Sequence, residues 1–213
     1  MATATLIAIL LVYNLGLAIL LFPFIFTFIG SLISKKEDQK QEKKGRTTKQ
    51  VLANAGVAVL STLLIKNPSE ATALVIYVFA IALSDTMSSE LGKKFSGPTY
   101  DICKFKKIKS GLSGGVSIIG TGFGLLGSSI MAIAALCYST SLNFFLAVLV
   151  IGFTGMLVDS ILGSLAQGKY QIGTKLTESG NKKDLVKGFH FIDNDAVNFL
   201  SILVTIGITV FIF

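Results

Sequence analysis

Six stretches of the chain are continuously apolar for about the length of a membrane-spanning helix, which is about 20 residues. They do not show the short alternation of apolar and polar positions that is typical of strands in a membrane barrel. The pattern therefore predicts an all-α fold: a polytopic transmembrane helix bundle of about six spans, forming a single integral membrane domain over residues 1–213. The predicted spans are 5–33, 51–66, 71–91, 114–138, 143–166 and 195–213.

The polar segments between these spans differ in length and charge. Segments 34–50, 92–113 and 167–194 are long and carry seven, six and five Lys or Arg residues, whereas the short connections carry only Lys66. Because basic residues gather on the cytoplasmic side of membrane proteins, we expect the long loops in the cytoplasm and the N-terminus outside. The first stretch lacks the basic start of a secretory signal, so we expect it to remain as one span bent near Pro23.

Composition supports the membrane class. Hydrophobic residues make up 52% of the chain, charged residues only 15%, and the mean hydropathy is +0.72, which excludes a soluble globular protein. The net charge of +7 needs no nucleic-acid partner, because anionic lipid headgroups attract each near-surface Lys or Arg by about 1 kcal/mol.

Cys103 and Cys137 are predicted on opposite sides of the membrane and form no disulfide. The lysine-rich segments 35–50 and 169–187 are expected to be mobile and solvated.

Several ionisable residues lie within the predicted spans, where each is unfavourable by about 2.5–3.5 kcal/mol and normally has a function. The third span ends with Asp85 and Glu90, which are about 140° apart on a regular helix and share a cation only if the helix loosens. In the fifth span, Gly155, Asp159 and Gly163 form one row. Close helix packing explains the two glycines but does not require the carboxylate.

Two other spans carry polar side chains at the same end. Arg46, Gln50 and Asn54 are spaced four apart and share one face of the second span. At the start of the sixth span, the helix dipole favours Asp195, but capping does not explain Asn198, one turn deeper. The polar groups of four spans are therefore predicted to converge beside the long loops.

A glycine-rich turn opens the fourth span. The free N–H groups of Ser113, Gly114, Gly115 and Ser117, together with the helix N-terminus, are suited to bind an anion such as phosphate. The turn is not a Walker A motif, since it lacks the Gly-Lys-Ser/Thr ending. Taken alone, glycines at the entrance of a span more often form a tight turn or allow close packing than bind an anion. Together with the carboxylates, which are hard oxygen ligands, the turn predicts a phosphate and Mg²⁺ site at the cytosolic interface.

Five short motifs, in order along the chain, resemble an integral membrane family that contains phytyl-phosphate kinase and the proteins called transmembrane protein 19. The resemblance covers about residues 46–213. The family's third-span motif usually has Trp where this chain has Met87, and its glycine motif usually has Thr where this chain has Leu112. The motifs are Gln50 to Gly56, Ser84 to Gly92, Gly111 to Ser117, Asp159 to Gln167 and Asn194 to Asn198.

The resemblance implies transfer of the γ-phosphate of a nucleoside triphosphate, with CTP the expected donor, to an isoprenyl monophosphate in the membrane. General phosphoryl-transfer chemistry then suggests roles for the polar residues. The catalytic candidates are Asp85, Asp159 and Arg46. The Mg²⁺ candidates are Asp85, Glu90, Asp159 and Asp195. The candidates for contacts to nucleotide and phosphate are Ser113, Gly114, Gly115, Ser117, Asn54, Lys93, Lys109 and Asn198.

Other functions stay open at this stage. An ion-coupled transporter would use the same buried acids, although transporter sites usually lie near the membrane midplane between repeated halves. A kinase acting on a free prenol would need a general base, which Asp85 or Asp159 is suited to supply. The pattern of the CDP-alcohol phosphotransferases is absent. The expected location is a multi-pass membrane protein with a cytosolic active face, in the plasma membrane if the source is prokaryotic, and a homo-oligomer is left open.

Overall fold

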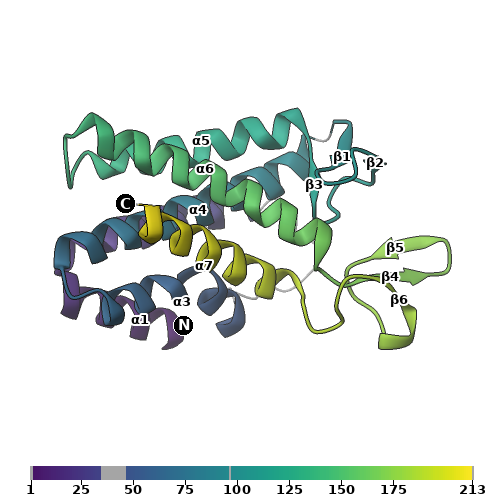
Figure 1. Ribbon diagram of the computed structural model, residues 1–213, viewed down its shortest axis with the longest axis horizontal. Coiled ribbons are helices and arrows are strands. Elements are labelled where there is room, and N and C mark those ends of the chain that lie inside the picture. The colour runs from purple at the N-terminus through teal and green to yellow at the C-terminus, as the bar shows by residue number, and fades with distance from the viewer. Residues whose placement is uncertain (1, 35–46, 96, 213) are drawn as a thin grey trace.

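The computed structural model describes residues 2–34, 47–95 and 97–212 (Figure 1). Within these ranges the chain forms a bundle of α-helices, which confirms the predicted helical membrane fold. Two small sheets lie at one end of it. The helices are α1 (Ala2–Leu15), α2 (Leu21–Ser34), α3 (Thr48–Leu64), α4 (Pro68–Lys94), α5 (Ile118–Ala135), α6 (Leu142–Leu165) and α7 (Asn194–Ile212).

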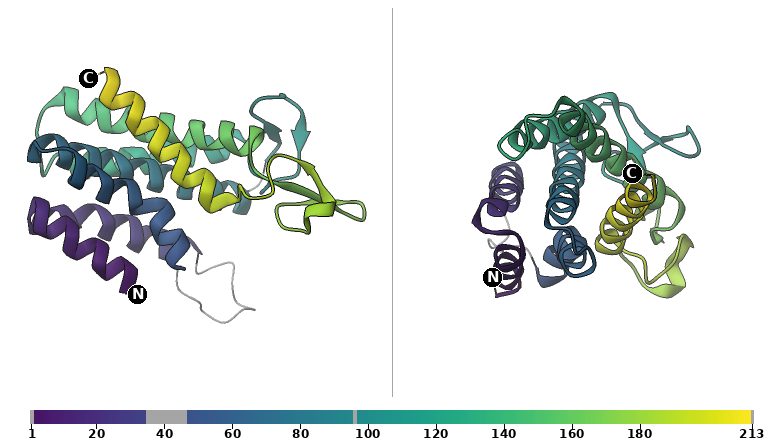
Figure 2. Two further views of the ribbon diagram at one scale, coloured as in Figure 1. Left: turned by 60° about the horizontal axis from the view of Figure 1, so that its bottom comes forward. Right: turned by 60° about the vertical axis from the view of Figure 1, so that its left-hand side comes forward.

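Four helices, α4 to α7, are long and apolar enough to cross a membrane, whereas α1 and α2 are shorter apolar helices. The number of spans therefore stays a prediction. Helix α4 is central: it contacts each of the other α-helices, and Figure 2 shows it end-on between them. Its largest buried side chains include Phe79, Ile76, Ile81 and Leu83.

Close contacts between small residues hold α4 against α5. A Cβ added at Gly127 would lie 2.9 Å from Ser84 Cα, and one added at Gly92 would lie 3.0 Å from Gly120 Cα. Lipid is as apolar as these side chains, so dense packing rather than burial from water stabilises such contacts. One polar contact adds to them, since Ser84 Oγ donates a hydrogen bond of 2.8 Å to the carbonyl of Gly124.

The segment predicted as one span at 5–33 is instead a helical hairpin, and this part of the prediction is wrong. The chain reverses at Gly16, whose φ of 85° favours glycine, and continues through a short 3₁₀ helix, η1 (Leu17–Leu20). Pro23 lies in the first turn of α2, where its missing N–H breaks no helical hydrogen bond.

The hairpin returns the beginning of the chain toward α3. Thr3 Oγ1 donates a hydrogen bond of 3.2 Å to Thr48 Oγ1 at the start of α3. Figure 2 shows the N-terminus part-way along the bundle, and the loop end is where α4 and α6 end and α5 and α7 begin. The side of the membrane on which the N-terminus lies stays a prediction.

The loop end carries two antiparallel three-stranded sheets, which the prediction of an all-α fold did not include. In the first, β1 (Thr99–Asp101) pairs with β2 (Lys107–Ile108) and β3 (Gly115–Val116). In the second, β4 (Lys169–Ile172) pairs with β5 (Lys175–Thr177) and β6 (Leu185–Lys187). The segment at 169–187, expected to be mobile and solvated, thus contains a sheet; most of it is exposed, but Lys169 and Tyr170 are buried, whereas the described part of 35–50 begins only at Thr47.

Candidate functional site

A polar cavity of about 340 Å³ lies at the loop end of the bundle, between α3, α4, α6, α7 and the turn before α5. It collects side chains from segments that are far apart in the sequence. Of the predicted site residues, eleven line it: Asn54, Asp85, Glu90, Lys93, Ser113, Gly114, Gly115, Ser117, Asp159, Asp195 and Asn198. Exposed Lys109 does not line this cavity, and Arg46 lies outside the described residues.

Asp159 is an acid of the cavity that is held from a neighbouring helix. It is buried on α6, and its Oδ1 accepts a hydrogen bond of 2.9 Å from Ser201 Oγ on α7. With the amide of Asn198 turned so that its nitrogen faces the acid, Asn198 donates to the same oxygen at 3.2 Å and to the carbonyl of Asn194 at 3.0 Å. Two donors from α7 thus fix one carboxylate oxygen, so Asn198 serves to orient Asp159.

Asp85 reaches the same cavity from α4 and is partly exposed to it. Glu90, the other acid predicted on this helix, forms an ion pair with Lys93, with 3.7 Å between Oε1 and Nζ. Among the described residues, no three Asp, Glu, His or Cys side chains are arranged to hold a metal ion together. The available donors are nevertheless carboxylate and amide oxygens, which suit a hard cation that takes its remaining ligands from substrate phosphates and water.

The start of α7 has a cap that accounts for one of its acids. Asp193 Oδ1 accepts the N–H of Ala196 at 3.1 Å, and the same side chain forms an ion pair with Lys49 on α3. Burial alone would raise the pKa of Asp193, but these contacts hold it below its usual value. Asp195 is not used in this way and lines the cavity.

The glycine-rich turn is seated directly on the end of α6. Gly114 has a φ of 79°, and a Cβ added there would lie 2.5 Å from Ser164 Cα. A Cβ added at Gly163 would lie 2.0 Å from Ser113 Oγ. Gly163 therefore provides space for the turn, whereas Gly155 packs against Ile81, as the helix-packing interpretation predicted. The same helix thus positions both Asp159 and the turn.

One N–H group of the turn already binds an anionic side chain. The backbone N–H of Ser113 donates to Oε1 of Glu178, which follows β5 and also lines the cavity. A carboxylate oxygen is therefore bound where the turn was predicted to bind an oxygen of phosphate. Glu178 was missed from the sequence because it lies in a polar loop, with no apolar context to mark it.

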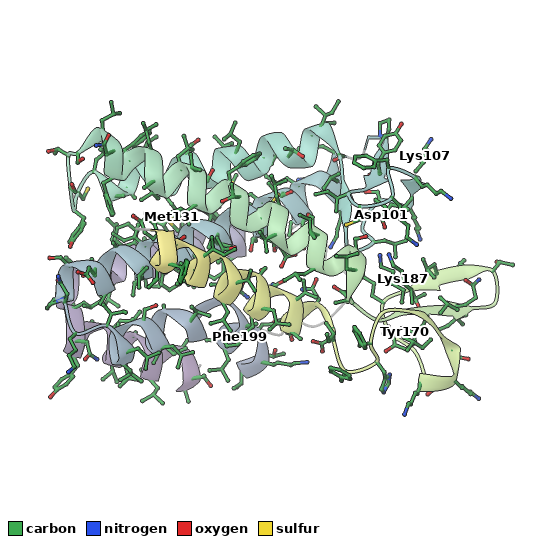
Figure 3. All side chains as sticks on the ribbon, viewed as in Figure 1. Asp101, Lys107, Met131, Tyr170, Lys187 and Phe199 are labelled. Carbon is green, nitrogen blue, oxygen red and sulfur yellow. The ribbon has the colours of Figure 1, made fainter. Side chains whose placement is uncertain are left out.

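Buried charged side chains from the two sheets contact the glycine-rich turn and the end of α6 on which it packs. Lys169 is only 3% exposed, and its Nζ donates to the carbonyl of Ser113 at 2.7 Å. Asp101 accepts a 2.7 Å bond from Ser164 Oγ, and its Oδ2 lies 3.6 Å from Lys187 Nζ, which joins the two sheets (Figure 3). Sequence reasoning also missed these residues, since charged side chains in long loops are usually solvated.

The electrostatics of these charged side chains follow from burial and from their contacts. Burial would raise the pKa of Asp101, but hydrogen bonds from Ser164 and from the N–H groups of Lys104 and Cys103, together with Lys187, lower it overall. The pKa of Lys169 is lowered, mainly by burial and to a smaller extent by repulsion from Lys187. The negative charge of Asp101 is therefore favoured in the folded protein and stabilises the cationic side chains that hold the turn.

Comparisons with known proteins agree with a membrane protein. The family model described as "Integral membrane protein DUF92" matches residues 1–206. An uncharacterized membrane protein of Methanocaldococcus jannaschii is 30% identical over 75% of this chain and 70% of its own length. Protein PGR of Arabidopsis thaliana is 29% identical over 86% of this chain and 75% of its own length. The chloroplastic protein VTE6 of the same plant is 31% identical over 58% of this chain but only 32% of its own length. No solved structure matches the chain.

Proposed function

The chain belongs to the DUF92 family of integral membrane proteins, and on this basis we propose that it is a membrane prenyl-phosphate kinase that uses CTP as donor and requires Mg²⁺. The observation that carries the proposal is the single cavity in which Asp85 and Asp159 face a glycine-rich turn at the end of the bundle. The resemblance to the family of phytyl-phosphate kinase and the similarity to VTE6 support the substrate class.

The proposed reaction joins two phosphates. An oxygen of the prenyl monophosphate bonds to the γ-phosphorus of the nucleotide, the bond from that phosphorus to the β-phosphate oxygen breaks, and the nucleoside diphosphate leaves. An ionised phosphate acceptor needs no strong general base, so the reaction depends mainly on alignment and on neutralising oxygen charge. This requirement fits a cavity lined by acids, amides and backbone N–H groups but by no histidine.

We assign roles to the lining residues on chemical grounds. Asp85 and Asp159 would hold Mg²⁺, which would neutralise the phosphate oxygens, with Glu90 and Asp195 as further oxygen ligands. The turn from Ser113 to Ser117 would bind phosphate oxygens through its N–H groups. Asn54 and Asn198 would orient oxygens or the carboxylate of Asp159. Lys93, at the edge of the cavity, would supply positive charge, as Arg46 and Lys109 would from the neighbouring loops.

Glu178 offers a test of the turn that does not remove a proposed ligand. A hydrogen bond to a charged group contributes about 1.5–3 kcal/mol, and nucleotide phosphate must displace the Glu178 carboxylate to use the Ser113 N–H. In Glu178→Ala we therefore expect the KM for CTP to fall by about tenfold, with kcat little changed. Asp184→Ala is the matched control, since it removes an acid of the same loop that does not line the cavity. Equal KM values in the two variants would show that the Ser113 N–H does not bind nucleotide.

The function itself is tested with purified protein in lipid nanodiscs. We would measure transfer of labelled γ-phosphate from CTP, ATP, GTP or UTP to prenyl monophosphates and to free prenols, with Mg²⁺ or with EDTA. A prenyl diphosphate formed from CTP and lost in EDTA is the expected result. A monophosphate formed only from free prenols would establish a prenol kinase instead. No product from any pair, with protein that unfolds cooperatively on heating, would overturn the kinase proposal and favour ion-coupled transport.

A further inference from the structure

A second cavity, of about 560 Å³, lies between α1, α3 and α7 and differs in character from the polar one. Its walls are almost entirely apolar. Helix α1 contributes Leu6 and Leu10, and α3 contributes Leu52 and Leu60. Helix α7 contributes Phe199, which is labelled in Figure 3. A volume of this size is within the range of about 300–1,000 Å³ that is typical of small-molecule sites. We call this cavity the apolar groove.

The apolar groove meets the polar cavity at the start of α7. Asp195 lines both cavities, and it is flanked in the groove by Lys49. These residues lie at the loop end, whereas Leu60 lies further along α3 toward the opposite end. The 1.5 Å rise of a helix places Leu60 about 16 Å from Lys49 along the axis of α3. The apolar groove therefore runs along α3 and has a charged end next to the proposed reaction site.

Packing of α3 against α7 shapes the inner wall of the groove. A Cβ added at Gly56 would lie 3.3 Å from the ring of Phe199, so glycine allows this ring to lie close against α3. Helix α1 closes the other side, where the hydrogen bond between Thr3 and Thr48 ties its beginning to the beginning of α3. Helix α1 of the N-terminal hairpin thus supplies one wall of the apolar groove.

We propose that the apolar groove binds the isoprenoid tail of the acceptor, with its phosphate entering the polar cavity past Lys49 and Asp195. This rests on the proposed function and adds to it the location and length selectivity of the acceptor site. The occupant follows from the connection between the cavities: a ligand that spans them needs a long apolar chain joined to a compact anionic head. Lys49, which is ion-paired with Asp193 at this end of the groove, is the cation that a passing phosphate head would meet, and the walls offer no hydrogen-bonding pattern for a polar chain.

Two tryptophan substitutions on α3 test the groove as a measure of chain length. Leu60→Trp fills its deep end, so the KM for geranylgeranyl and phytyl monophosphate should rise by about tenfold or more, while that for geranyl monophosphate stays unchanged. Leu52→Trp fills the groove near the head and should raise the KM for all of them. Leu63→Trp is the matched control, because Leu63 is 62% exposed on the same helix and does not line the groove. It should behave as the unaltered protein for every chain length.

A binding experiment separates failure of the groove from failure of the kinase proposal. Farnesyl monophosphate with a diazirine at its tail end would be photolysed with the protein in phosphatidylcholine nanodiscs, and the labelled peptides would be identified by mass spectrometry. Labelling of α1 and α3 that unlabelled farnesyl monophosphate prevents is the expected result, and it would support the groove even if no transfer occurs. Two results would exclude the groove as the tail site. One is phosphate transfer with the same chain-length preference in Leu60→Trp as in Leu63→Trp. The other is labelling of α1 and α3 that an excess of unlabelled prenyl phosphate does not reduce.

Discussion

The Asp159→Asn protein should fold and yet transfer phosphate about 10³-fold more slowly than the unaltered protein. The substitution preserves the shape of the side chain and an oxygen that accepts the hydrogen bond from Ser201, so it removes little besides the charge. Loss of that charge removes one of the carboxylates that we assign to Mg²⁺. The rate should be measured at saturating CTP and prenyl monophosphate, with folding checked by thermal unfolding of the protein in nanodiscs.

Graded variants on α7 make this prediction more specific. Ser201→Ala removes a donor to Asp159 but keeps the charge, so we expect a loss of about 10–100-fold and a weaker affinity for Mg²⁺. Thr209→Ala is the control, because this hydroxyl donates to the carbonyl of Thr205 in its own helix. Full activity in Asp159→Asn would contradict the assignment of this acid, whatever Ser201→Ala does.

The second large effect is expected from Gly114→Ala. The new Cβ would lie 2.5 Å from the Cα of Ser164, and backbone atoms within a packed helix end cannot move aside as a flexible side chain can. The left-handed conformation adds about 1–2 kcal/mol, and overpacking adds about 1–3 kcal/mol. We therefore expect a lower midpoint of thermal unfolding and loss of phosphate transfer, because the turn can no longer pack against the end of α6.

Gly122→Ala is a control for the same chemical change on a neighbouring helix. No atom lies within 4 Å of the added Cβ at Gly122, and alanine favours a helix interior by about 0.5–1 kcal/mol. This variant should keep its activity and unfold at the same or a higher temperature. If Gly114→Ala behaves like Gly122→Ala in both measurements, the close seating of the turn on α6 has no functional importance.

The sequence predicted those site residues that are charged and lie within a continuous apolar helix. A carboxylate such as Asp159 within a continuous apolar helix is unfavourable, so its presence indicates a function before its neighbours are known. Helical periodicity then places Asp159 and Gly163 on one face, and the structure shows that this face meets both the cavity and the glycine-rich turn. Whether these residues carry the proposed roles stays a prediction until the variants are measured.

The N-terminal hairpin was missed for a physical reason. Hydropathy reports how apolar a segment is and not whether its helix continues, so two short apolar helices look like one long span. Gly16 was the available signal, since glycine permits the positive φ at which the chain reverses. Pro23 drew attention instead, although proline in a first helical turn is favourable.

No comparable feature of the sequence indicated the two sheets at the loop end or the charged contacts that they make. Strands of two to four residues are too short to show alternation, and their pairing joins positions that only the folded bundle brings together. Lys169 is buried because a carbonyl of the glycine-rich turn lies within reach of its ammonium group, and Glu178 reaches the same turn from the following loop. Such partners are determined by tertiary packing, which local sequence does not specify.

The two cysteines of the chain lie at opposite ends of the bundle. Cys103 lies between β1 and β2 at the loop end, whereas exposed Cys137 follows α5 at the other end, next to Tyr138, whose hydroxyl donates to the carbonyl of Ser69. The native thiols are therefore built-in markers of sidedness: a membrane-impermeant maleimide applied to intact cells would report which end of the protein faces the medium, without any engineered label.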